Sequence, residues 1–235
     1  MHLNKYLAHA GICSRRKAVE LIKEGKIRVN NTIVAEPGYQ VRTDDIVRVG
    51  EKMVRLQENF YVLLNKPKGY ITTVADERGR KTVMHLLGDA ANNSRLYPVG
   101  RLDRDTTGFL LLTNDGELAQ KLSHPRYEVK KMYHVTLSRV FDSASIERVK
   151  EGLMLEDGKI EVDHVSYVPE NPRSRVRIQL HSGKNRIVRR IFEHLGYEVL
   201  KLDRVNYAGL SLKGVARGAW RYLTKKEIQQ LNKTL

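Results

Sequence analysis

Two aspartates in a short polar loop have the clearest capacity for chemistry in this sequence. Asp103 and Asp105 lie in the stretch GRLDRDTTGFLLLTND, residues 100–115, whose loop runs directly into an apolar strand expected at Phe109–Thr113. An anchored carboxylate is suited to nucleophilic attack or to proton transfer. Two carboxylates could serve a glycosidase, but spacing by one residue in an extended loop directs them to different sides. A turn or cap role, common for Asp in loops, is the alternative.

A basic helix is expected in the stretch HSGKNRIVRRIFEHLG, residues 181–196. Its apolar residues share one face at helical spacing, whereas Arg186 and Arg190 lie nearly opposite and Arg189 falls at the boundary. From that boundary a guanidinium could enter a cleft and pair with a carboxylate, a planar contact for which Arg is suited. Solvation at the surface is the alternative for Arg186 and Arg190, and it stays open for Arg189.

An aromatic ring and an ammonium share one side of the strand expected in KKMYHVTL, residues 130–137. Lys131 and Tyr133 alternate with Met132 and His134, so the first two point the same way. If that side faces a cleft, the ring suits a base and the ammonium suits a phosphate. Packing of the ring in the core is the alternative.

The elements that must position these residues begin with a small N-terminal segment. Apolar residues at helical spacing predict a helix near Leu3–Ala10 and a second one that starts after Ser14 and ends at Gly25. The pair Asn30-Asn31 tolerates positive φ and predicts a hairpin, after which Val47–Val49 forms a further short strand.

A cluster of cations opens the second of these helices. Arg15, Arg16 and Lys17 occupy its first turn, where the helix dipole disfavours positive charge. Because a helix N-terminus also directs free N–H groups outward, the cluster is suited to bind phosphate. Chance placement on a basic surface is the alternative.

Charge indicates the kind of partner. The formal net charge is +15, from 42 Lys and Arg against 27 Asp and Glu, which favours a polyanion. Cys13 is the only cysteine, so an intrachain disulfide and a multi-cysteine zinc site are excluded and a reducing compartment fits. The sequence has no glycine-rich nucleotide-binding motif, no histidine spacing typical of metal ligands, no apolar run of membrane-spanning length and no signal peptide. We therefore expect a soluble, cytoplasmic protein.

The N-terminal segment resembles a known module. HAGICSRRKAVELIKEGKIRVNNTIV is similar to the small RNA-binding domain named after a protein of the small ribosomal subunit, of the α-L type. The resemblance implies contact with RNA through Arg15, Arg16, Lys17, Lys26 and Arg28. Such modules occur in many proteins and name no reaction.

The whole chain resembles the ribosomal pseudouridine synthases that follow such a module with a catalytic domain. The similarity runs through YVLLNKPKGY, YPVGRLDRDTTGFLLLTNDGELAQKLSHP, KKMYHV, GKNRIVRR and RGAWRYLTKKE. It implies an α+β protein with an RNA-binding module at residues 1–56 and a catalytic domain at residues 57–235. That domain is expected to contain a mixed, largely antiparallel sheet with flanking helices. The reaction breaks the bond from nitrogen 1 of uracil to the sugar and rejoins the base through carbon 5. No cofactor, metal or nucleotide is needed, because reactant and product contain the same atoms.

The resemblance also implies roles for particular residues. Asp103 is the essential carboxylate, which attacks the sugar or the base or removes a sugar proton, and Arg189 pairs with it. Tyr133 stacks on uracil, Arg101 fills the space of the extruded base, and Asp105 has only its turn or cap role. The implied RNA contacts of the catalytic domain are Lys66, Lys131, Lys184, Arg186 and Arg190.

Two positions depart from the family pattern, and two functions compete with the leading one. Ile187 stands where relatives usually carry Gln, and Asn31 where the hairpin often has Gly. HPRYEVKKMY and LKLDRVNYAGLSL are more similar to the large-subunit branch than to the small-subunit branch. We therefore expect a monomer that acts on large-subunit ribosomal RNA or a pre-ribosomal particle. The rivals are a small-subunit enzyme and a non-catalytic RNA-binding assembly factor; a glycoside hydrolase is a weaker one.

Overall fold

The N-terminal part folds as two helices against a small sheet, as the sequence predicts. The computed structural model describes residues 1–90 and 95–234. Ser14 caps the second helix, because its Oγ accepts a hydrogen bond from the Lys17 backbone N–H at 3.2 Å. Asn30 and Asn31 adopt φ values of 50° and 68°, which allows the tight hairpin. The elements, with the sheet in the order β2-β1-β3-β4, are α1 (Leu3–His9), α2 (Arg15–Lys23), β1 (Ile27–Val29), β2 (Thr32–Ile33), β3 (Val47–Val49) and β4 (Lys52–Met53).

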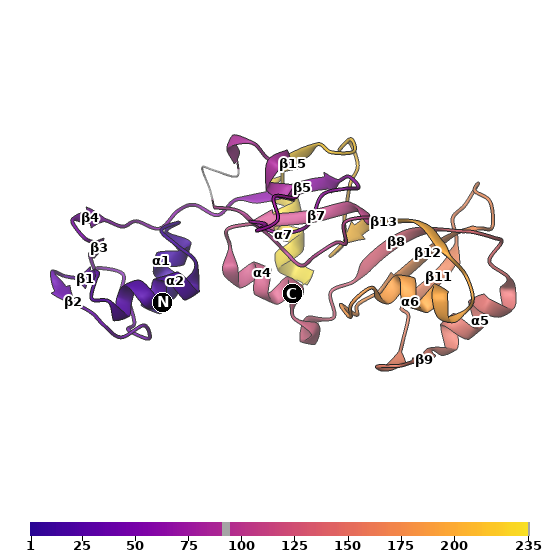
Figure 1. Ribbon diagram of the computed structural model, residues 1–235, viewed down its shortest axis with the longest axis horizontal. Helices are drawn as coiled ribbons and strands as arrows, with labels where there is room; N and C mark the ends of the chain where they lie inside the picture. Colours follow the sequence, from indigo (N-terminus) through magenta and orange to yellow (C-terminus); the bar gives the residue numbers. More distant parts are fainter. Residues whose placement is uncertain (91–94, 235) are drawn as a thin grey trace.

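The rest of the chain is built on one large mixed sheet (Figure 1). Its strand order is β11-β12-β8-β13-β7-β5-β15, with β14 beside β13 and β6 beside β7. Only the β7–β13 pair is parallel among the strand pairs described in this sheet. The strands are β5 (Tyr61–Lys66), β6 (Tyr97–Pro98), β7 (Thr107–Thr113), β8 (Lys131–Leu137), β11 (His164–Tyr167), β12 (Arg175–Leu180), β13 (Val199–Tyr207), β14 (Leu210–Ser211) and β15 (Trp220–Tyr222).

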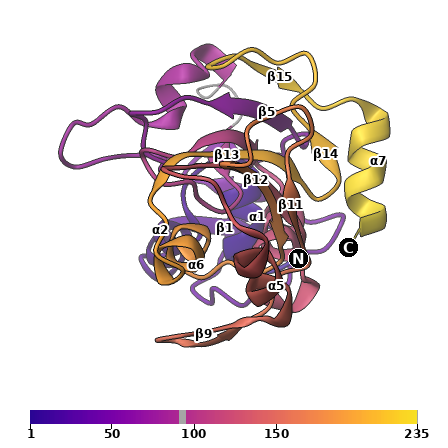
Figure 2. The ribbon, with the colours of Figure 1, turned by 90° about the vertical axis from the view of Figure 1, so that its right-hand side faces the viewer.

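Helices cover both faces of the sheet, and the sheet separates two buried clusters. On β7, Leu110 and Leu112 belong to one buried cluster and Phe109 and Leu111 to the other, as expected when side chains alternate along a strand. Figure 2 shows α5 and α6 beneath the sheet and α7 at its side. The first cluster packs with η1 (Val83–Leu86), α5 (Ser143–Glu151), α6 (Ile187–His194) and the hairpin of β9 (Leu153–Leu155) and β10 (Gly158–Ile160); the second packs with α4 (Gly116–Ser123), η2 (Pro125–Tyr127) and α7 (Lys225–Thr234).

Within residues 1–90 and 95–234, no helix has the length and apolar character needed to cross a membrane.

The parallel junction of β7 and β13 depends on a glycine. Gly108 has a φ of 107°, and a Cβ built on it would lie 2.3 Å from the backbone oxygen of Arg204. A side chain at this position would therefore force the two central strands apart. The junction lies directly after the loop that carries Asp103 and Asp105.

Gly108→Ala is expected to lower the free energy of unfolding by about 4 kcal/mol, from steric overlap with β13 together with backbone strain. Urea denaturation of the purified protein measures this change. Gly183→Ala is the matched control, because no atom of the described residues, apart from its chain neighbours, lies within 4 Å of a Cβ at that position and its φ is not positive. A Gly108 variant as stable as this control would contradict the steric argument.

Candidate active site

The loop between β6 and β7 holds Asp103 at the edge of a cavity. Leu102 is buried, and the Thr106 backbone N–H donates to the Asp103 carbonyl at 3.1 Å, which closes a turn. The side chain of Asp103 keeps 39% of its surface exposed. The sequence prediction that this loop is held against the sheet is therefore correct, and its carboxylate is accessible.

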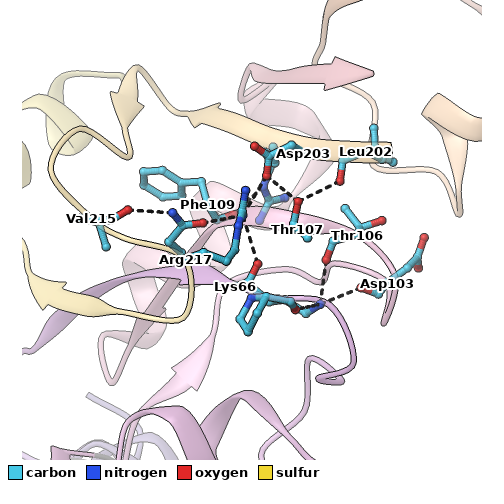
Figure 3. A network of polar contacts seen from close by, with 12 residues as sticks. Lys66, Asp103, Thr106, Thr107, Phe109, Leu202, Asp203, Val215 and Arg217 are labelled. Atoms are coloured by element: carbon cyan, nitrogen blue, oxygen red, sulfur yellow. Dashed lines mark hydrogen bonds and ion pairs between the residues drawn. The ribbon is translucent and has the colours of Figure 1, made fainter. Parts of the chain in front are cut away.

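Lys66 anchors this loop from the inside. Its ammonium is completely buried and donates to the carbonyl oxygens of Asp103 at 2.9 Å and Thr106 at 2.8 Å (Figure 3). A longer bond reaches the Pro67 carbonyl at 3.3 Å. Burial lowers the pKa of Lys66 to about 8. The sequence prediction that Lys66 contacts RNA is wrong, because the residue ends the buried strand β5 and points into the loop.

Thr72 also fixes this loop, a role that no sequence pattern predicts. Its hydroxyl donates to the Leu102 carbonyl at 2.7 Å and accepts from the Leu102 N–H at 3.2 Å. The Gly69 N–H donates to the Arg104 carbonyl at 2.9 Å. The backbone on both sides of Asp103 is thus tied to the segment that follows β5.

A network of polar side chains supports the start of β7 (Figure 3). Thr107 Oγ1 donates to the Asp203 carboxylate at 2.6 Å, and Arg217 reaches the same carboxylate at 3.0 Å. Arg217 also donates to the Asn65 side-chain oxygen at 2.6 Å. These residues join β5, β7 and β13 beneath the loop. The sequence of β13 shows alternating buried and polar positions, but it could not predict which strands its polar side chains contact.

The cavity beside Asp103 has a volume of about 480 Å³ and is predominantly polar. Such a volume is within the range of small-molecule sites. It is lined by Arg101, which is exposed, and Asp103 from the loop, by residues of the segment from Ile71 to Arg80, and by Asn185. In that segment the Arg80 guanidinium binds Asp76 at 2.6 Å and lowers the pKa of this carboxyl to about 2. Arg101 and Asp103, both predicted from the sequence as site residues, thus line the same cavity.

The arginines before and within α6 meet the loop in an arrangement that corrects one prediction. Arg189 does not pair with Asp103; its Nη2 lies 2.6 Å from the carboxylate of Asp105. Asp103 instead faces Arg186, at 3.8 Å. The reason is register: Arg186 precedes the first turn of α6, whereas Arg189 lies one turn further along and meets the later loop residue. Asp105 therefore has an ion-pair partner that the expected turn or cap role did not include.

Tyr133 and Lys131 share one side of β8, as predicted, and that side faces the larger core. Tyr133 is only 9% exposed, and neither residue belongs to the described lining of the 480 Å³ cavity. Lys131 donates to the carbonyls of His181 at 2.6 Å and Val129 at 3.0 Å. Burial lowers its pKa to about 8. Its ammonium is thus engaged within the protein, and contact of either residue with RNA stays a prediction.

Two further predicted RNA contacts face an acid of the β9–β10 hairpin. Arg190 forms an ion pair with Asp157, and Lys184 donates to the Asp157 carbonyl at 2.8 Å. Hydrogen bonds from Arg190 lower the pKa of Asp157 to about 2. The two cations secure the hairpin against the start of α6, so their contact with RNA stays a prediction.

The five cations predicted to bind RNA in the N-terminal module are all exposed. Lys17 pairs with Glu20 at 2.7 Å and Lys26 with Glu24 at 2.7 Å, while Arg28 lies 3.9 Å from Glu51. Within the described part of the chain, Arg15 and Arg16 have no acidic side chain within 4 Å.

A second cavity, of about 410 Å³, lies where the N-terminal module meets the larger part of the chain. Arg15 lines it together with Tyr97, Gly100 and residues of α4. An ion pair between Lys5 and Glu117 and a hydrogen bond of 2.8 Å between His9 and Asn59 join the two parts nearby. Gly100 lines this cavity and the next residue, Arg101, lines the first, so the two cavities adjoin the same loop.

The site has an accessible carboxylate on a rigid loop, with arginines around it and a basic module beside it. Such a site is suited to a reaction on a polyanion. The sequence has no glycine-rich nucleotide-binding motif. A model of the family described as RNA pseudouridylate synthase matches residues 60–194, and one described as the S4 domain matches residues 1–47. The chain belongs to the RNA pseudouridine synthase family and carries an N-terminal S4 domain. It is an isomerase, as the resemblance of its motifs implied.

Individual relatives support this assignment over nearly the full length. The chain is 43% identical to "Ribosomal large subunit pseudouridine synthase B" of Bacillus subtilis over 232 residues, 97% of this chain and 94% of the relative. It is 39% identical to an "Uncharacterized RNA pseudouridine synthase" of Aquifex aeolicus over 238 residues, 100% of this chain and 95% of the relative. The crystal structure of a pseudouridylate synthase, 27% identical, superimposes with a TM-score of 0.69 and covers 98% of this chain and 99% of that one. The predicted α+β fold is thereby confirmed.

Proposed function

We propose that this pseudouridine synthase isomerises one or more uridines of large-subunit ribosomal RNA. The observation that carries the proposal is the carboxylate of Asp103, held on an anchored loop at the wall of a polar cavity of about 480 Å³. Near-full-length identity of 43% to a large-subunit synthase supports the choice of RNA.

In the proposed reaction Asp103 is the reacting carboxylate. It attacks the sugar or the base, or removes a sugar proton, while the bond from nitrogen 1 to the sugar breaks and the bond from carbon 5 forms. The proton on carbon 5 leaves to water, and nitrogen 1 gains one. Tyr133 stacks on the uracil and assists loss of the carbon 5 proton. Arg101, exposed at the wall of the cavity, occupies the space that the extruded base leaves in the RNA.

We propose that the two parts of the chain have different functions. Residues 1–56 bind RNA and residues 57–235 carry out the reaction. Arg15 and Arg16 are the cations best placed to bind phosphate, because they are exposed at a helix N-terminus and Arg15 lines the cavity of about 410 Å³ beside the catalytic domain. We propose that the enzyme acts as a monomer in the cytoplasm, on ribosomal RNA or on a pre-ribosomal particle.

Replacing Arg15 and Arg16 together with Ala is expected to weaken RNA binding about tenfold and to reduce the slope of log K against log salt by about 2, since two phosphate contacts are lost. Fluorescence anisotropy with a labelled ribosomal RNA fragment over a salt series measures both quantities. The matched control is Lys23→Ala, an exposed cation at the other end of α2. If the double variant and the control bind alike, these arginines do not contact RNA.

The substrate is tested by mapping pseudouridine in both ribosomal RNAs of cells with and without the gene. The proposal expects at least one uridine of the large-subunit RNA to stay unmodified in the deletion strain, with modification restored by the wild-type gene. Loss of a small-subunit site instead would identify the small-subunit enzyme. No dependent site in either RNA would favour a non-catalytic assembly factor.

A further inference from the structure

The two carboxylates of the loop from residue 100 to residue 107 have different surroundings. Asp105 binds the guanidinium of Arg189 at 2.6 Å, whereas the nearest cation to Asp103 is Arg186, at 3.8 Å. Asp103 lines the 480 Å³ cavity, and Asp105 is absent from the described lining. The residue held by a short ion pair is therefore not the one that faces the space for a substrate.

Arg189 needs a partner because its charge is buried. Its side chain is only 8% exposed, and a guanidinium stays charged at all working pH values. Nη1 donates to the Val199 carbonyl at 3.0 Å, while Nε is buried with no partner in the described structure. Asp105 is the only carboxylate within 4 Å of Arg189 among the described residues. Loss of Asp105 would leave a buried charge uncompensated.

The pair also completes the support of the loop. Lys66 holds the carbonyls of Asp103 and Thr106, the residues on either side of the Arg104–Asp105 segment, from within the sheet. Arg189 holds the Asp105 side chain from α6, and α6 is joined to β13 through Val199. The loop next to Asp103 is thus restrained by two separate elements, β5 through Lys66 and α6 through Arg189.

We infer that Asp105 is a positioning residue: its ion pair with Arg189 fixes the loop in the geometry that presents Asp103 to the substrate. An oxygen engaged at 2.6 Å with a buried guanidinium is poorly suited to attack or to take a proton, and this leaves the reactive role to Asp103. The inference rests on the proposed function. It divides two neighbouring acids of one loop into a reactive one and one that acts through Arg189.

The test compares Asp105→Ala and Asp105→Asn with wild type, using release of tritium from carbon 5 of labelled uridine in ribosomal RNA. Asp105→Ala is expected to lower kcat about 30-fold with little change in KM, as for a misplaced reacting group. Asp105→Asn retains an oxygen that can accept from Arg189 and is expected to lose about fivefold, a partial rescue. A role in stability alone would move the melting temperature but not kcat of the folded enzyme well below that temperature.

Two further measurements, in the Arg189→Ala background and on Asp103→Asn, keep the outcomes distinct. In the background of Arg189→Ala, adding Asp105→Ala is expected to reduce kcat by less than twofold, because residues that act as one unit are not additive. If Asp105→Ala does not fold, the positioning role is tested by Asp105→Asn and by the variants in the Arg189→Ala background. Wild-type kcat in both Asp105 variants would overturn the positioning role. An inactive Asp105→Asn beside an active Asp103→Asn would overturn it too, since Asp105 would then be the reactive acid. If instead neither Asp103→Asn nor Asp105→Asn reduces kcat, the proposed role of the loop itself fails.

Discussion

Asp103→Asn is expected to abolish tritium release from carbon 5 of uridine, with kcat lowered by at least about 1,000-fold, because an amide can neither attack nor accept the proton. The fold should stay intact. Asp103 is partly exposed, and the one ion pair described for its side chain is that with Arg186 at 3.8 Å. Its main-chain carbonyl, which Lys66 binds, is unchanged by the substitution.

The measurement is a single-turnover assay with labelled ribosomal RNA, together with thermal unfolding. Asp44→Asn is the matched control, an exposed acid of the N-terminal module that is expected to keep full activity. An Asp103 variant within tenfold of wild type would exclude the carboxylate from the chemical step. Because RNA binding depends on other residues, the variant is expected to bind RNA with wild-type affinity.

Lys66→Met is the second substitution with a large expected effect. Removing the ammonium leaves the carbonyls of Asp103 and Thr106 buried without their donor, which is expected to destabilise the fold by about 3 kcal/mol at pH 7. The loop should also relax, and a displacement of about 1 Å in the reacting group would lower kcat about 100-fold. Lys68→Met is the control, since that lysine belongs to the same turn but is exposed. Equal stability and activity of the two variants would refute the anchoring role.

The stability difference between wild type and Lys66→Met should depend on pH in one direction. Burial lowers the pKa of Lys66 to about 8, whereas the unfolded chain keeps a value near 10.5. Between these values the unfolded state binds more protons, so the wild type gains stability relative to the variant as the pH rises. We expect a gain of about 2 to 3 kcal/mol between pH 7 and pH 10, from 1.36 kcal/mol per pKa unit. Urea unfolding of both proteins across this range measures it, and a constant difference would contradict it.

The sequence predicted the elements well where a local signal exists. Ser14 caps α2 and Asn30-Asn31 forms the hairpin, because both depend on neighbouring backbone groups. The helix of Arg189 and the strand of Tyr133 follow from the spacing of apolar residues. The resemblance to a family then indicated Asp103 as the catalytic residue. Its position in the sequence alone was also compatible with a turn or cap role.

The sequence could not predict which charges meet in space. Lys66 was expected to contact RNA, but β5 continues to this residue and its side chain enters the loop. The pairing of Arg189 with Asp105 depends on where α6 begins relative to the loop, a relation between segments about 80 residues apart. Thr72 contacts Leu102, 30 residues further along the chain, and a lone threonine gives no sequence pattern. Each of these contacts joins segments that are distant in the sequence, so no local pattern could predict it.

Whether Asp103 carries out the isomerisation is best tested in cells. Pseudouridine is mapped in the large-subunit RNA of a deletion strain that produces either the wild-type protein or Asp103→Asn at equal levels. We expect the wild-type protein to restore the missing pseudouridine and the variant to leave uridine at the same position. Restoration of the modification by Asp103→Asn would contradict it.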